Sequence, residues 1–226
     1  RVFYVAFIIY FIIGGIASLD GNSHESMKGW FFAQIILTIM AAPGLIANSL
    51  TKEYELGNLD MLRMTLLRPH HIILGKYTAG FASLSPMLFA AVFSVFPMLL
   101  LGKPDFEVLF MGYGTLMVCS ILSISIGLLS SLLTNQTTVS IMISYTISLI
   151  LYFGLTLAAQ WFDFGDGQFA MCLSPVLILD EVLYSWRGGG ILYTEWLYAM
   201  GVWLFVSFMM LNVSLYLFYR NKMHDV

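Results

Sequence analysis

Long apolar stretches alternate with short polar ones along this chain. No Asp, Glu, Lys or Arg occurs in five windows, namely residues 2–19, 29–51, 77–102, 108–162 and 196–219. A bilayer core of about 30 Å needs about 20 apolar helical residues to cross it. The fourth window is long enough for two crossings, and the polar residues 134–137 predict a turn within it.

The pattern predicts an all-α integral membrane protein with six transmembrane helices. Backbone groups in lipid must be hydrogen-bonded internally, so only helices and closed barrels can cross. The apolar runs are continuous and lack the period-two alternation of barrel strands. Because the chain begins at Arg1 rather than Met, we expect further residues upstream. We assign residues 1–226 to a single transmembrane domain, with spans at about 2–18, 30–50, 77–101, 108–133, 138–160 and 197–219.

The composition supports a membrane protein and argues against a water-soluble or nucleic-acid-binding one. The chain is 59% hydrophobic and 10% charged, whereas a soluble domain carries about 25% charged residues. There is too little polar surface to cover a water-soluble globule, so a lipid bilayer is the expected solvent. The net charge of −3 is small, and the chain has no basic tract, so we expect no nucleic-acid partner.

Lysine and arginine are distributed unevenly between the two predicted sides. Seven of the ten fall on the side that holds Arg1, residues 51–76, the 134–137 turn and the C-terminus. The positive-inside rule places that side, with the C-terminus, in the cytoplasm. We therefore expect a multi-pass protein of the cell membrane, with the bacterial cytoplasmic membrane as the favoured setting.

The opposite side contains one sizeable polar connection, the outer segment 161–195. Within it, residues 171–184 are apolar but too short to cross a bilayer. They predict a re-entrant or interfacial helix before the sixth span.

The connection between spans two and three, residues 51–76, is densely polar. Gly57-Asn58 predicts a turn, and Asp60 in the first turn and Arg68 in the last turn suit the two ends of a helix dipole. Pro69 stops such a helix, so the sequence predicts a short cytoplasmic helix over Leu59–Arg68. Apolar side chains on two of its faces indicate contact with protein as well as with the bilayer edge.

This segment resembles the ABC-2 type permeases, whose pattern reads roughly E-x-E-x-G-T-L-E-x-L-x-x-T-P-L, then G-K before the third span. The positions that match are Glu53, Glu55, Gly57, Leu59, Leu62, Thr65, Leu67, Gly75 and Lys76. Asn58 replaces Thr and Asp60 replaces Glu, which keeps the capping and charge chemistry. Leu66 replaces Pro, which leaves the turn after Thr65 open. The layout of six spans, and Ser174-Pro175 before the last, is also similar.

The resemblance implies a half-transporter that works with a separate ABC ATPase subunit. In that family the second-to-third connection docks onto the ATPase, which binds ATP and Mg, and no cofactor is expected in this chain. The implied ATPase-coupling residues are Glu53, Glu55, Gly57, Asp60, Arg63, Thr65 and Arg68. Pairing with a copy or with a second permease subunit, as a homodimer or heterodimer, would form the translocation route.

The residues themselves also indicate an external motor. Ion-coupled carriers use ionisable residues inside the membrane, and the charge-free windows contain none. The chain lacks the G-x-x-x-x-G-K-[ST] phosphate cradle. We expect no catalytic residues and no metal site, since the adjacent His70 and His71 point to different helix faces. The pattern assigns no substrate-binding residue.

Two other readings stay open at this level. A passive channel should show a ring of polar residues along a helix face, and no span shows one clearly. A non-transporting assembly scaffold would associate with membrane partners but with no ATPase. An intramembrane enzyme would need a convergent set of acid, His or Ser side chains inside the membrane, which charge-free spans disfavour.

Overall fold

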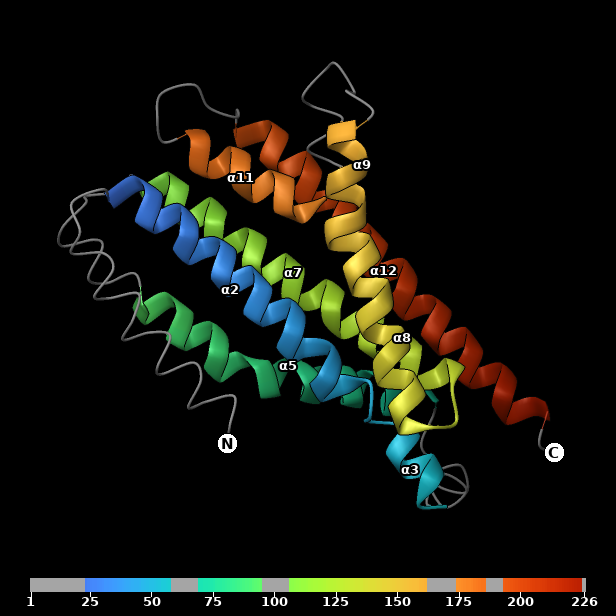
Figure 1. Ribbon diagram of the computed structural model, residues 1–226. Helices are drawn as coiled ribbons and strands as arrows, with labels where there is room; N and C mark the ends of the chain where they lie inside the picture. Colours follow the sequence, from blue (N-terminus) through green and yellow to red (C-terminus); the bar gives the residue numbers. More distant parts are fainter. Residues whose placement is uncertain (1–22, 58–68, 95–105, 162–173, 186–192, 225–226) are drawn as a thin grey trace.

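The computed structural model describes residues 23–57, 69–94, 106–161, 174–185 and 193–224 (Figure 1). Across these residues the protein is helical and contains no strand. Five helices are long and apolar enough to cross a membrane, which confirms a helical, multi-pass membrane protein. The predicted span 2–18 and the predicted helix Leu59–Arg68 lie outside the described residues.

The helix bounds follow the charge-free windows closely at some ends and depart from them at others. α7 begins two residues before the predicted 108–133 span, whereas α5 begins at Pro69, well before the predicted start at residue 77. Proline fits the first turn of a helix, because its missing N–H would be unpaired there. The helices are α2 (Ser23–Ile46), α3 (Thr51–Glu55), α5 (Pro69–Ser94), α7 (Phe106–Leu133), α8 (Thr137–Leu149), α9 (Leu155–Trp161), α11 (Pro175–Ser185) and α12 (Tyr193–His224), with a π-helical turn η1 (Ile150–Gly154) between α8 and α9.

α7 is the central helix of the bundle. It is apolar around its whole circumference and buried over most of its length, and it packs against α2, α5, α8, α11 and α12. Small residues allow the close approach: a Cβ at Gly112 would lie 2.7 Å from the Phe31 ring, and one at Gly114 would lie 2.6 Å from the Trp196 ring. Small residues at membrane helix interfaces serve this purpose generally.

The predicted 30–50 span is not one continuous α-helix. α2 ends at Ile46, a turn covers residues 47–50, and α3 begins at Thr51. Asn48 and Ser49 favour turns because their side chains bond locally to the backbone. The turn redirects the chain at the end of the membrane-spanning helix, so that α3 stands at the tip of the bundle (Figure 1).

α11 corresponds to the short helix that the sequence predicts within the outer segment 161–195. Its apolar side chains Ile178, Leu179 and Val182 are buried, and it packs against α2, α7 and α12. α11 and α9 lie at one end of the bundle. α3, the α7–α8 turn and the end of α12 lie at the other (Figure 1). The predicted orientation in the membrane requires residues 51–76, the 134–137 turn and the C-terminus to lie on one side, and α3, the α7–α8 turn and the end of α12 do lie at one end.

Ser174 ties α11 to the π-helical turn of the fifth predicted span. Its Oγ donates to the Tyr152 carbonyl (3.0 Å) and accepts from the Val176 N–H (3.2 Å). It also lies 2.8 Å from the Thr156 hydroxyl, which itself donates to the Tyr152 carbonyl (2.5 Å). A π-helical turn breaks the regular pairing of carbonyls. Ser174 therefore caps α11 and shares the Tyr152 carbonyl with the Thr156 hydroxyl.

Replacing Ser174 with Ala is expected to lower stability by about 1 kcal/mol, the usual cost of losing a helix cap. For a chain of this size that corresponds to a fall in Tm of about 2–4 °C in detergent. Ser85→Ala is the matched control, because among the described residues the partly buried Ser85 bonds within its own helix, to the Ala82 carbonyl. Equal melting temperatures for the two variants would contradict the cap assignment.

Candidate coupling site

α3 is anchored by residues at its start and ended by a glycine. Leu50 and Thr51 are buried, and the Thr51 hydroxyl donates to the Ala47 carbonyl (3.2 Å). Gly57 has φ 69°, a left-handed conformation that glycine adopts without a Cβ penalty. Gly57 thus has the conformation of a turn residue, whereas Asn58, the second residue of the predicted turn, lies outside the described residues. α3 is a single short helix held against the end of the bundle.

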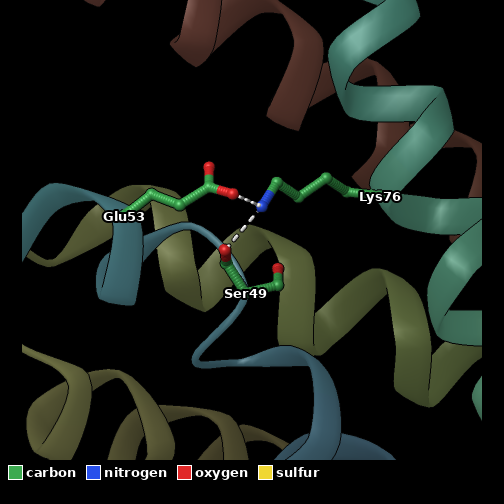
Figure 2. A network of polar contacts seen from close by, with 3 residues as sticks. All are labelled: Ser49, Glu53 and Lys76. Atoms are coloured by element: carbon green, nitrogen blue, oxygen red, sulfur yellow. Dashed lines mark hydrogen bonds and ion pairs between the residues drawn. The ribbon is translucent and has the colours of Figure 1, made fainter. Parts of the chain in front are cut away.

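Glu53 connects α3 to α5. The Lys76 ammonium donates to Glu53 Oε1 (2.5 Å) and to the Ser49 carbonyl (2.6 Å), as Figure 2 shows. The side chains of Lys76 and Glu53 are 19% and 29% exposed, so solvent screens this pair less than a fully exposed one. Hydrogen bonds between ionised partners are shorter and stronger than neutral ones. The third predicted span is thus fixed to α3 by one lysine.

Glu55 connects α3 to α8. Its Oε1 accepts the Thr137 N–H at 2.6 Å, across 82 residues of sequence. The first N–H groups of a helix have no partner within it, and the N-cap residue Gln136 makes no side-chain cap bond. A carboxylate at this end is also favoured by the helix dipole. The hydrogen bond from the Thr137 N–H holds the pKa of the exposed Glu55 carboxyl below its usual value.

These contacts form a unit that we call the α3 clamp, defined as Glu53 with Lys76 and Glu55 with Thr137. The two carboxylates of the E-x-E pair bind two different membrane helices, α5 and α8. Because α3 contacts both, a displacement of α3 must either move the starts of α5 and α8 or break a charge-assisted bond. The clamp therefore provides a mechanical connection from the tip of the bundle to its spans.

Two apolar side chains of the same stretch are exposed. Tyr54 is 48% exposed and Leu56 is 65% exposed. They alternate with the two glutamates and follow the end of α2, beyond the charge-free part of the span. Exposed apolar groups at a polar tip suit contact with another protein.

The structure brings together only part of the predicted coupling set. Glu53, Glu55 and Gly57 lie on or directly after α3. Sequence reasoning did not identify Tyr54, Leu56 and Thr137 as functional, and it took Lys76 only as a motif match. The alternation of acidic and apolar residues at 53–56 was the signal available for the first two. The predicted residues outside the described part of the chain are Asp60, Arg63, Thr65 and Arg68.

No protein-family model matches the chain, and a search of curated proteins finds no match. The likeness to ABC-2 type permeases therefore depends on residues 51–76 and on the helix layout. Among the described residues, no group of three or more His, Cys, Asp or Glu is placed to hold a metal ion.

Replacing Glu55 with Gln should give a pH-dependent loss of stability. The amide oxygen can still accept the Thr137 N–H but carries no charge. Because the folded-state pKa of Glu55 lies below 4.5, the carboxylate stabilises the fold fully above pH 4.5 and less as the pH falls through the lowered pKa. We expect the wild type to melt above Glu55→Gln at pH 7, with the difference vanishing in acid. Equal melting temperatures at pH 7 would contradict the capping role.

Proposed function

We propose that this chain is the membrane-spanning permease subunit of an ATP-driven exporter of the ABC type. Residues 51–76 couple it to a separate ATPase subunit, which binds ATP and Mg. Two such subunits, identical or not, form the translocation route between them. The observation that carries the proposal is the α3 clamp: carboxylates bind a short helix to two spans, while Tyr54 and Leu56 on the same stretch are exposed.

The clamp suggests how closure of the ATPases reaches the membrane. A partner that presses on Tyr54 and Leu56 moves α3 as a rigid unit, since Gly57 ends it and buried Leu50 anchors it. Lys76 passes the displacement to α5, and Thr137 passes it to α8. The spans tilt and the route opens outward. In this mechanism Glu53 and Glu55 transmit the motion, and the two apolar side chains receive it.

The absence of charged residues from the spans indicates that the energy for transport comes from another chain. The spans contain no charged residue to carry a coupling ion, and the chain has no phosphate cradle of the P-loop type. An uphill cycle then depends on an ATPase in another chain. The tip of the bundle that holds α3 is the place where such a subunit can contact two spans at once.

Replacing Leu56 with Asp tests this docking. A charged group in place of an apolar contact should lower recovery of the ATPase with the purified permease about tenfold, the effect of about 1.4 kcal/mol. The control is Phe106→Asp, because Phe106 is 82% exposed and begins α7 at the opposite end of the bundle. Recovery of the same ATPase with Leu56→Asp and with the wild type would contradict docking at α3.

A further inference from the structure

A cavity of about 640 Å³ opens between α2, α3 and α5 at the α3 end of the bundle. Its lining includes the charged or titratable side chains of Lys52, Glu53, His71 and Lys76. It also includes apolar residues, among them Leu45, Ile46, Ile72 and Ala79. The cavity is thus amphipathic, because charged and apolar side chains line the same space.

The charged part of the cavity lining favours an anionic ligand. Lys76 is already paired with Glu53, so these two charges largely cancel. Lys52 is exposed and makes no ion pair with the described residues. His71 lies in the first turn of α5, where the unpaired N–H groups and the helix dipole attract negative charge. Lys52 and His71 therefore line the same cavity.

The length of the cavity indicates an occupant with an apolar tail. Along α5 its lining runs from His71 to Ser83, about 18 Å at 1.5 Å per residue. That distance is more than half of a bilayer core of about 30 Å. A free phosphate ion would contact only the charged part of the lining and would leave the apolar part without a ligand.

We propose that this cavity binds an anionic phospholipid. The phosphate of the headgroup lies between Lys52 and His71, and the first part of an acyl chain follows Leu45, Ile72 and Ala79. The cytoplasmic leaflet, on which the cavity opens in the predicted orientation, attracts basic groups near its anionic headgroups. This site goes beyond the proposed transport function. It adds a lipid ligand that touches both α3 and α5, the helices joined by Glu53 and Lys76.

The test is native mass spectrometry of the full chain extracted from nanodiscs with equal parts of phosphatidylglycerol and phosphatidylcholine. We expect wild-type protein to retain phosphatidylglycerol selectively. In Lys52→Ala/His71→Ala the preference should fall about fivefold or more, because the loss of one basic group near an anionic surface, Lys52, costs about 1 kcal/mol. Arg220→Ala is the matched control, because Arg220 is an exposed cation at the same end of the bundle that does not line the cavity.

A second variant tests the apolar part of the site. Gly75 lines the cavity, and a Cβ built there meets nothing within 4 Å. Gly75→Leu should fill the space without a clash and remove retention of phosphatidylglycerol, while the protein elutes and melts as a folded species. Glycerol phosphate added in excess should not displace the lipid if the acyl chain contributes. Undiminished selectivity in both variants, or full displacement by glycerol phosphate, would overturn the proposal.

Discussion

Replacing Glu53 with Lys is expected to abolish the stimulation of the partner ATPase by this chain while leaving membrane insertion intact. The substitution places a second ammonium group beside Lys76, where a 2.5 Å ion pair now joins α3 to α5. Loss of a charge-assisted bond, together with like-charge repulsion, costs on the order of 1–3 kcal/mol. Coupled hydrolysis should fall about fivefold to a hundredfold, since 1.4 kcal/mol is a factor of ten. The measurement is ATP hydrolysis by the reconstituted complex relative to the free ATPase.

The charge swap separates the ion pair from other effects of the substitution. Glu53→Lys/Lys76→Glu restores opposite charges on the same two helices, so it should recover a large part of the stimulation. Glu107→Lys serves as the control, because Glu107 lies in the first turn of α7 at the other end of the bundle. Full stimulation in Glu53→Lys would remove this pair from the coupling path. Loss without any rescue by the swap would show that α3 acts through other contacts.

Replacing Gly127 with Leu should prevent α2 from packing on α7. A Cβ at Gly127 would lie 3.2 Å from Ile46 Cβ and 3.4 Å from the Ala47 backbone nitrogen. Leucine adds three carbons beyond its Cβ. Neither the Cβ of Ile46 nor the backbone nitrogen of Ala47 can shift without moving the main chain of α2. Overpacking of this kind costs about 1–3 kcal/mol, which lowers Tm by several degrees in detergent.

The chain offers a matched control for that variant. Gly201 lies on α12, and a Cβ there meets nothing within 4 Å, so Gly201→Leu should melt like the wild type. Because α2 leads through the 47–50 turn into α3, Gly127→Leu should also weaken ATPase coupling. Melting temperatures that are equal for the two leucine variants would contradict the close approach of α2 and α7.

The sequence predicted the spans well wherever charge marks the boundary. α7 and the α8–η1–α9 helix follow the charge-free windows because burying a charge in lipid is costly. The end of α2 at Ile46 was missed, since Ala47 and Leu50 are as apolar as the span before them. The π-helical turn at 150–154 was missed as well. It depends on the buried Tyr152 and on bonds from Ser174, which hydropathy does not encode.

The coupling site was predicted as a segment but not as a set of contacts. The polar composition of 51–76 locates it, and the dipeptide Gly57-Asn58 predicts its turn. Composition cannot show that Glu53 and Glu55 bind different helices, because their partners Lys76 and Thr137 are distant in sequence. Two residues between and after the glutamates, Tyr54 and Leu56, became candidates only when their exposure was known.

The account depends most on what touches α3 in the cell. A photoreactive phenylalanine analogue in place of Tyr54, which is 48% exposed on α3, should crosslink in native membranes to a protein with a P-loop ATPase motif. The same analogue in place of Tyr198, which is 76% exposed near the start of α12 at the opposite end, should not. An ATPase adduct at position 54 alone is the predicted result. Adducts there only with lipid, or with proteins from the outer side of the membrane, would contradict the account.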